Sequence, residues 1–299
     1  MTASRLGGNS RAKELAMNGS RLKRAELALA LLVLVIGTAT CRDAPSPTAP
    51  PDRPSFIING QPTGDNSFSN VGALLFDFDQ NGLITGDDAL CSGSLIAPTV
   101  FLTAAHCVSF FPANAQLYVS FDANLFAQPL QKLIAATQFH FDPGFGHDLG
   151  DLHDVAVVLL PAGSTTAIQP LQLPPAGLLD DLAAHNGLKD QIFLNVGYGV
   201  DATLRRKPHY TFDGVRKVSK SPFMALEPFW LWLNMNSHAT GLGGDCFGDS
   251  GSPKFFDGNT NLIVATVTTG DAVCRATSKD YRLDTSTARA FLGQFVSLP

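Results

Sequence analysis

Short apolar runs rich in Val, Leu, Ile, Phe and Thr alternate with turn signals along most of the chain. The clearest runs lie at 71–76, 94–105, 116–121, 155–160, 192–200 and 261–268. Stretches such as DFDQNG, FDPGFG and DGNTN stand between or beside them. Many strands punctuated by Gly, Pro and Asn, with few helical periods, predict an all-β barrel or sandwich.

A single helix is predicted near the C-terminal end. Asp284, Thr285 and Ser286 belong to the residue types that cap helix N-termini. The segment ARAFLGQFV that follows has apolar residues at helical spacing. We therefore expect a C-terminal helix over about residues 286–296.

The first 41 residues have the pattern of an export signal. Basic residues precede an apolar run at 27–36, which is too short to span about 30 Å of hydrocarbon but fits a signal-peptide core. Cys41 ends this segment at the place of the lipidated cysteine of bacterial lipoproteins, although residues 38–40 fit the lipoprotein box poorly. The alternative is ordinary cleavage after Ala39. Both interpretations predict export, either as a secreted protein or as a cell-envelope protein anchored to the membrane through Cys41.

Residues 42–56 carry five prolines and no apolar periodicity, so they are predicted to form an extended tether or pro-segment. Strand-like patterning begins at Ile57. The folded domain is therefore expected over residues 57–299.

Composition and net charge argue against a disordered chain and give no support to a nucleic-acid-binding protein. The chain is 45% hydrophobic and 16% charged, which is typical of a globular domain with a real core and not of a disordered chain. The formal net charge is −5, so nothing in the charge balance points to nucleic acid as a partner.

Four cysteines remain once Cys41 is set aside, and an even number in an exported chain favours disulfides. No CxxC motif occurs, so a structural zinc site has little support. The simplest pairing joins sequence neighbours: Cys91 with Cys107, and Cys246 with Cys274.

Three residues far apart in the chain could together form a nucleophilic site. His106 follows an apolar run in TAAHC, Asp154 opens the run at 155–160, and Ser250 lies in the turn GDSG. A serine nucleophile needs a general base and a carboxylate that orients the base. Taken alone, each residue has an ordinary structural explanation: a surface histidine, a strand-capping aspartate and a turn serine.

Three motifs together resemble those of the chymotrypsin-like serine proteases of the trypsin family. They are, in chain order, CSGSLIAPTVFLTAAHC, HDVAVVLL and GDSGSP. IING at the start of the folded part, GYG at 197–199 and the final helix extend the resemblance over residues 57–299. The spacings fit as well, with 48 residues from His106 to Asp154 and 96 from Asp154 to Ser250. The resemblance implies two six-stranded antiparallel β-barrels, over about 57–170 and 178–285, followed by the helix.

Catalytic roles follow from the same resemblance. Ser250 is expected to be the nucleophile, His106 the general base, and Asp154 the residue that orients the histidine. The N–H groups of Gly248 and Ser250 are expected to form the oxyanion hole. No cofactor is expected.

Activation is implied too. In this family a new N-terminal amine, here that of Ile57, pairs with the aspartate before the nucleophile, here Asp249. Phe56 stands where the family more often has Arg or Lys, so a trypsin-like activator is not expected.

The resemblance also suggests the substrate pocket. Gly244 occupies the pocket-floor position, where trypsins carry Asp, while Thr268, Thr269 and Gly270 are similar to the wall that pairs with substrate. We therefore expect an apolar or aromatic P1 residue, which is the residue N-terminal to the cleaved bond. Asp245 or Asp280 could instead restore basic specificity, and Arg282 could neutralise Asp280.

A segment at 77–88 matches the calcium loop of an EF-hand at four possible ligands, Asp77, Asp79, Asn81 and Asp88. Its flanks are strand-like, however, and Asn81-Gly82 is a strong hairpin signal. Calcium is the weaker of the two interpretations, and no other metal is predicted.

The sequence thus predicts a monomeric, exported serine endopeptidase acting on polypeptides. The alternatives are a catalytically silent binding protein on the same scaffold and an activity restricted to esters.

Overall fold

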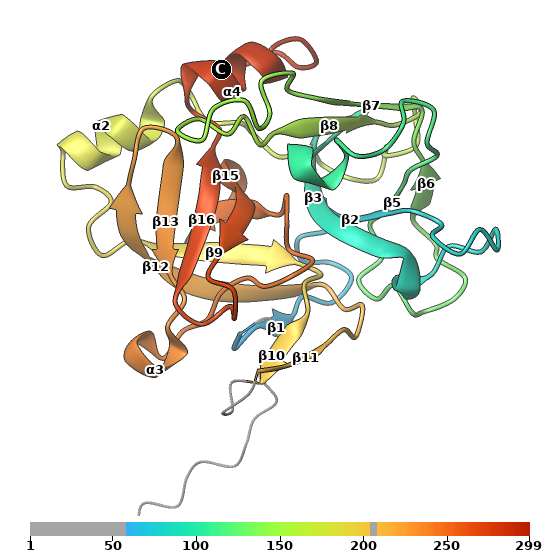
Figure 1. Ribbon diagram of the computed structural model, residues 1–299, viewed down its shortest axis with the longest axis horizontal. Coiled ribbons are helices and arrows are strands. Elements are labelled where there is room, and N and C mark those ends of the chain that lie inside the picture. Colours follow the sequence, from blue (N-terminus) through green and yellow to red (C-terminus); the bar gives the residue numbers. More distant parts are fainter. Residues whose placement is uncertain (1–57, 204–207) are drawn as a thin grey trace, which may run out of the picture. The chain divides into compact units, whose positions relative to one another are not determined.

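The computed structural model describes residues 58–203 and 208–299, and these residues form an almost entirely β structure (Figure 1). The predicted signal peptide, the proline-rich tether, Cys41 and Ile57 lie outside the described residues. The all-β prediction is confirmed, and the strands divide into two antiparallel sheets and one small hairpin.

The first sheet has seven antiparallel strands in the order β6-β5-β2-β3-β4-β8-β7. Their bounds are β2 Val71–Leu75, β3 Ala89–Ala97, β4 Val100–Thr103, β5 Tyr118–Ser120, β6 Leu133–Ala135, β7 Gln138–Phe141 and β8 Ala156–Leu159. The predicted closed barrel is replaced by a curled sheet, because no ladder joins β6 to β7 in the described chain. Instead β6 and β7 are consecutive parts of one bent segment, whose first part pairs with β5 and whose second part pairs with β8.

The second sheet is a closed six-stranded barrel, as predicted. Its order is β12-β13-β16-β15-β14-β9, closed by a further ladder between β9 and β12, with β1 added at one edge. The bounds are β1 Gln61–Pro62, β9 Ile192–Gly197, β12 Lys217–Leu226, β13 Trp230–Asn234, β14 Pro253–Phe256, β15 Asn259–Gly270 and β16 Thr277–Arg282.

The remaining elements are short. They are the hairpin of β10 Asp201–Thr203 and β11 His209–Thr211, the 3-10 helices η1 Gly86–Asp88 and η2 Ala105–Cys107, and the α-helices α2 Leu178–Ala184, α3 Ser237–Thr240 and α4 Ser286–Leu292. As expected, α4 begins after a capping residue, since the Thr285 side chain accepts the N–H of Ala288. The helix ends four residues earlier than predicted, because the chain beyond Gly293 continues in isolated turns. None of the described helices is both long and apolar enough to cross a membrane.

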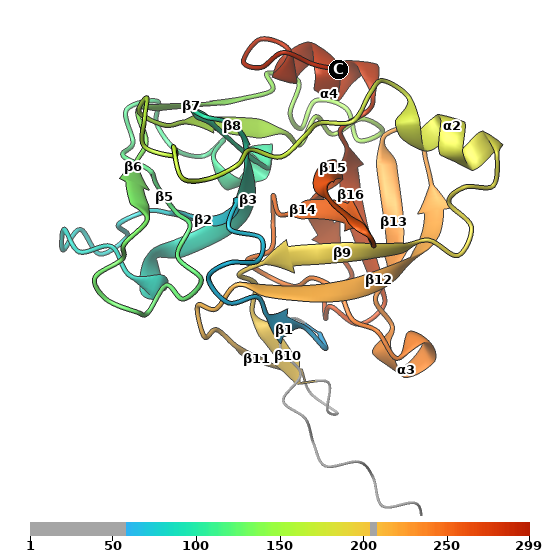
Figure 2. The same ribbon diagram turned by 180° about the vertical axis from the view of Figure 1, so that it is seen from behind.

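One apolar core joins the two sheets. It combines Val71 and Leu102 of the first sheet with Val196 and Phe255 of the second, and Phe291 of α4 packs into the same cluster. Both views show α4 at the end of the molecule near β8 and β15 (Figures 1 and 2). Burying a large apolar side chain contributes about 1.5–3 kcal/mol. This shared core therefore fixes how the sheets meet. His106 and Asp154 lie between strands of the first sheet, and Ser250 lies between strands of the second.

Candidate functional site

His106 and Asp154 are in direct contact, although 48 residues separate them. The Asp154 carboxylate accepts the backbone N–H of His106 at 2.9 Å and lies 2.8 Å from the ring nitrogen Nδ1. An ionised carboxylate only accepts hydrogen bonds, so Nδ1 carries the proton and Nε2 is left as a base. Asp154 is completely buried, whereas the His106 side chain is one-third exposed (33%). The pair therefore presents a basic nitrogen toward solvent from a fixed, buried anchor.

Local structure explains how the pair is held. His106 lies in η2 directly after β4, and its neighbour Cys107 forms a disulfide with Cys91 of β3. Asp154 precedes the buried residues Val155 to Val158, so the strand carries the carboxylate inward, as its sequence pattern predicts.

Ser250 lies in a turn that is tied to both sheets. The Ser250 carbonyl accepts the N–H of Ser92 from β3 at 2.9 Å, and the N–H of Gly251 donates to Val267 of β15 at 2.8 Å. Gly251 has a φ of 78°, and a Cβ there would lie 2.3 Å from the Thr103 hydroxyl, so only glycine fits. The turn is thereby held in one position between the two sheets.

The oxyanion-hole candidates have free donors. The carbonyl of Gly248 accepts the Ser92 hydroxyl at 2.9 Å, but within residues 58–203 and 208–299 neither the Gly248 N–H nor the Ser250 N–H has a hydrogen-bond acceptor. Likewise no hydrogen bond joins the Ser250 hydroxyl to the His106 ring in this part of the chain. Such bonds are often long in unliganded active sites and tighten when substrate binds.

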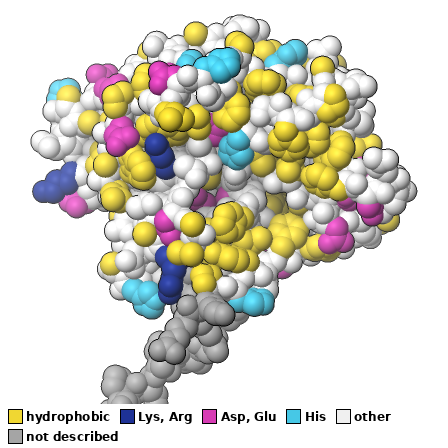
Figure 3. All heavy atoms as spheres, viewed as in Figure 1, with side chains coloured by type: hydrophobic (Ala, Val, Ile, Leu, Met, Phe, Trp, Pro, Cys, Tyr) yellow, Lys and Arg dark blue, Asp and Glu magenta, His cyan; other side chains and the backbone are white. Residues whose placement is uncertain are grey.

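A cavity of about 400 Å³ opens beside Ser250. Its lining includes the predicted wall residues Thr268, Thr269 and Gly270, together with Asp245 and the Cys246–Cys274 disulfide. The complete lining is Met235, Asp245, Cys246, Phe247, Ser250, Val267, Thr268, Thr269, Gly270, Asp271, Ala272 and Cys274. On the face drawn in Figure 3, hydrophobic side chains gather on both sides of a central hollow with a histidine between them.

Gly244, the predicted pocket floor, is not part of this lining. Met235 occupies that place, since a Cβ on Gly244 would lie 2.3 Å from the Met235 sulfur. No sequence signal pointed to Met235, because a methionine after a strand is usually an ordinary core residue.

A buried group of charges lies behind the cavity. Lys254 donates to Asp245 at 2.6 Å and lies 3.5 Å from Asp280, and all three residues are buried. Burial raises the pKa of Asp280 to about 7, with a further contribution from the charge of Asp245, although Lys254 opposes the shift. The Ser278 hydroxyl lies within hydrogen-bond distance of both carboxylates, at 2.9 Å and 2.8 Å.

The suggested neutralisation of Asp280 by Arg282 is wrong. Arg282 instead pairs with Asp180 and Asp284. Asp280 and Arg282 point the same way along β16, but the register places Asp280 next to Lys254 and Arg282 next to α2.

Asp249 is the most unusual carboxylate of the site. It is buried, and its two oxygens accept the N–H groups of Gly199 and Cys246, each at 2.9 Å. Burial, followed by the nearby charge of Asp245, raises its pKa to about 7. Its predicted partner, the amine of Ile57, lies outside the described residues. The next residue, Ile58, is fully buried, and its carbonyl accepts the Gly244 N–H at 3.2 Å.

Comparison with known proteins identifies the family. The trypsin family profile matches residues 57–290. The chain belongs to the trypsin family. Serine protease 28 of the mouse, Mus musculus, is 27% identical over 221 residues, which cover 67% of this chain and 74% of the mouse protein.

Solved structures support the same fold. A mutant of human heparin binding protein superposes with a TM-score of 0.57 at 16% identity, covering 79% of this chain and 95% of that one. HL collagenase superposes with a TM-score of 0.56 at 21% identity, covering 80% and 97%. At these identities the likeness establishes the chymotrypsin-like fold. It does not decide between an enzyme and a binding protein, because one of the two structures is named for binding.

Two disulfides connect the predicted cysteine pairs of this trypsin-family domain. Disulfides form in oxidising compartments, so they are consistent with an extracellular protein. Nothing in the fold supports a lipid anchor at Cys41.

The acidic segment at 77–88 joins the antiparallel strands β2 and β3, as the hairpin interpretation requires, but as a long loop that contains η1. The carboxylates of Asp77, Asp79 and Asp88 approach within 4.8 Å of one another. They already accept backbone N–H groups, including those of Asn81, Gly82 and Thr85. Calcium binding here stays a prediction.

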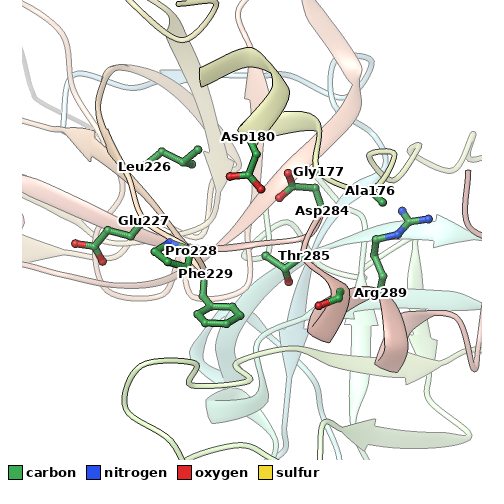
Figure 4. A pocket seen from close by; sticks show the side chains of 11 residues that line it. Ala176, Gly177, Asp180, Leu226, Glu227, Pro228, Phe229, Asp284, Thr285 and Arg289 are labelled. Carbon is green, nitrogen blue, oxygen red and sulfur yellow. The ribbon is translucent and has the colours of Figure 1, made fainter. Parts of the chain in front are cut away.

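A larger cavity, of about 880 Å³, lies between α2 and the start of α4 (Figure 4). Three of its four charged groups are already engaged: Arg289 donates to the carbonyl of Pro174, and Asp180 and Asp284 pair with Arg282, while the fourth, Glu227, is exposed. None of the predicted catalytic residues lines it, so the cavity beside Ser250 is the better candidate for substrate.

Proposed function

We propose that this trypsin-family protein is an exported serine endopeptidase in which Ser250, His106 and Asp154 form the catalytic triad. One combined observation carries the proposal: a buried carboxylate fixes the histidine tautomer that leaves Nε2 basic, and two N–H groups of the serine turn have no acceptor within residues 58–203 and 208–299. Acyl transfer needs these parts, namely a base, a nucleophile and donors for the developing oxyanion.

The chemistry follows from the roles of these groups. Ser250 attacks the scissile carbonyl while His106 takes its proton, giving a tetrahedral intermediate whose oxyanion meets the N–H groups of Gly248 and Ser250. His106 then donates the proton to the leaving amine, and an acyl-enzyme remains. Water attacks the acyl-enzyme by the same route in reverse, and Asp154 stabilises the imidazolium at each stage.

Substrates are polypeptides with an uncharged, preferably apolar P1 side chain. The cavity beside Ser250 supports this preference: Met235 contributes an apolar surface, and the charge of Asp245 is already paired with Lys254. Pocket groups of this kind typically change the preference for a side chain by 10–200-fold.

Activation is proposed to follow cleavage after Phe56. The amine of Ile57 would then pair with Asp249, a buried carboxylate that otherwise relies on two backbone N–H groups. An ion pair of this kind forms only when both partners are present, which makes it a usable switch. Protein beginning at Ile57 should therefore be active, and protein that retains residues 42–56 should not.

Labelling with a fluorophosphonate tests the proposal. We expect protein beginning at Ile57 to be labelled, and the labelling to be lost in Ser250→Ala and His106→Ala. Ser252→Ala is the matched control, because this neighbouring serine is fully buried and its hydroxyl has no hydrogen-bond partner in the part of the chain that the structure describes. Unlabelled protein with a confirmed Ile57 terminus would refute the triad and favour a binding protein on the same scaffold. Labelled protein that cleaves esters but no peptides would restrict the activity to esters.

A further inference from the structure

A buried lysine stands directly behind the cavity beside Ser250. The Lys254 side chain is completely buried, in the strand β14 that follows the serine turn. Its ammonium donates to Asp245 at 2.6 Å and to the Asn195 side chain at 2.5 Å, and Asp280 lies 3.5 Å away. These partners hold the ammonium in one place.

Asp245 connects this lysine to the cavity. It lines the cavity but is only 4% exposed, and its second oxygen accepts the Ser278 hydroxyl at 2.9 Å. Asp271 is the other carboxylate of the lining. It is more exposed, and its oxygens accept the N–H groups of residues 275–277. Asp245 is therefore the buried negative charge that an incoming side chain would meet.

We propose that Lys254 is a specificity-determining residue of this pocket: as the internal counter-ion of Asp245, it excludes Lys and Arg side chains and selects uncharged ones. This proposal rests on the proposed function, since the pocket must receive the P1 side chain. Lys254 acts without touching substrate. The Asp245 carboxylate stays in the pocket lining, but it does not attract cations because Lys254 already neutralises its charge.

Electrostatics supports this role. Burial alone would lower the pKa of Lys254, but the carboxylates of Asp245 and Asp280 outweigh it and raise the pKa above its ordinary value. The ammonium therefore stays charged at neutral pH. A substrate cation would meet a carboxylate whose charge is already compensated, and it would also lie close to a like charge in a region of low dielectric constant.

Binding of 4-aminobenzamidine, an aromatic cation whose fluorescence rises when it leaves water, tests the pocket without requiring catalysis. We expect weak binding to the unaltered protein and at least about tenfold tighter binding to Lys254→Met. The gain should vanish in Lys254→Met/Asp245→Asn and persist in Lys254→Met/Asp271→Asn, which changes the other carboxylate of the lining. A gain that survives Asp245→Asn, or equal binding by the unaltered protein and Lys254→Met, would overturn the proposal.

A second comparison keeps Lys254 in place, in case Lys254→Met does not fold. The unaltered protein should bind the amidine weakly and Asp245→Asn no more tightly, because Asp245 has no free charge to offer and its removal leaves Lys254 less compensated. If the unaltered protein instead bound the amidine tightly and Asp245→Asn abolished that binding, Asp245 would already serve an external cation and the proposal would fail.

A panel of peptides that differ only at P1 tests the same role of Lys254 in catalysis. Lys254→Met should shift kcat/KM toward Lys and Arg relative to Leu by about tenfold or more. Fluorophosphonate labelling, run in parallel, separates the two ways to fail. Unlabelled protein with the expected amidine binding would refute the serine endopeptidase alone. Labelled protein with an unchanged P1 preference would refute the role of Lys254 alone.

Discussion

The buried carboxylate of Asp249 should make the uncleaved protein less stable as the pH rises. Its pKa is about 7 in the folded chain, against 3.8 for an ordinary aspartate. Because the folded state binds this proton more tightly than the unfolded state does, the stabilising effect is complete below about pH 4 and is lost as the pH rises through about 7. About three pKa units at about 1.4 kcal/mol each give a loss of about 4 kcal/mol as an upper limit.

Asp249→Asn removes this titration while nearly preserving the shape of the side chain. The amide turns one acceptor into a donor facing the N–H of Gly199 or Cys246, which costs about 1–3 kcal/mol at every pH. The informative quantity is therefore the change in stability between pH 4.5 and 7.5, not the stability at one pH. Between pH 4.5 and 7.5 the titration of Asp249 contributes about 2.3 of the three pKa units, so we expect this change to be smaller in the variant by up to about 3 kcal/mol. The pH dependence of stability that remains in the variant comes in part from Asp280, because burial also raises the pKa of that carboxyl.

Urea unfolding, followed by the fluorescence of Trp230 and Trp232, measures the effect in protein that retains residues 42–56. Asp257→Asn is the control, since that carboxylate is exposed and pairs with an exposed lysine, Lys220. Parallel stability curves for unaltered protein and Asp249→Asn across this pH range would refute the reasoning. After cleavage at Ile57, the new amine should stabilise the ionised carboxylate, and the difference between the two proteins should shrink or reverse sign.

Three further changes test the site. Asp154→Asn should lower kcat/KM by about 10⁴-fold with the fold intact, because an amide facing Nδ1 selects the wrong histidine tautomer. Steady-state kinetics measure the activity and circular dichroism checks the fold. Near-normal activity would contradict the proposed role of Asp154. Cys91→Ser/Cys107→Ser opens a loop with a sequence separation of 16 and should cost about 3 kcal/mol in urea unfolding; an unchanged midpoint would count against this cost. Met235→Ala enlarges the cavity and should raise kcat/KM for Tyr or Trp at P1 relative to Leu by about tenfold; a fixed ratio would show that Met235 does not limit the pocket.

Residues within short, specific motifs could be placed from the sequence. TAAHC ends one strand and HDVAVVLL begins another, and the resemblance to the trypsin family implies that His106 and Asp154 lie together. Their hydrogen bonds agree with that expectation. The cysteine pairing was also predictable, because both disulfides join cysteines that are near in sequence.

The groups around the pocket could not be placed in the same way. Lys254 stands in an apolar strand, where a lysine ordinarily marks a bulge or a solvent-facing position. Its burial depends on Asn195, Asp245 and Asp280, which come from other strands and from the turn. The register between those strands decides which charges meet, and for the same reason the suggested pairing of Arg282 with Asp280 failed.

The balance of buried charge links the two proposals, an internal lysine counter-ion and a new N-terminal amine. Asp245, Asp249 and Asp280 are all buried near the serine turn, and among the described residues Lys254 is the ammonium that contacts this cluster. Asp245 holds Lys254 on the cavity side. Asp249 faces Gly197 and Gly199, and a Cβ added to these glycines would lie 2.2 Å and 2.1 Å from the Asp249 oxygens. The glycines leave the Asp249 carboxylate closely surrounded by backbone, and the proposed amine of Ile57 would supply a second cation on that side when the carboxylate is ionised. The two carboxylates can therefore be neutralised independently: Lys254 would set what the pocket accepts, and the amine of Ile57 would set when the serine turn is stable.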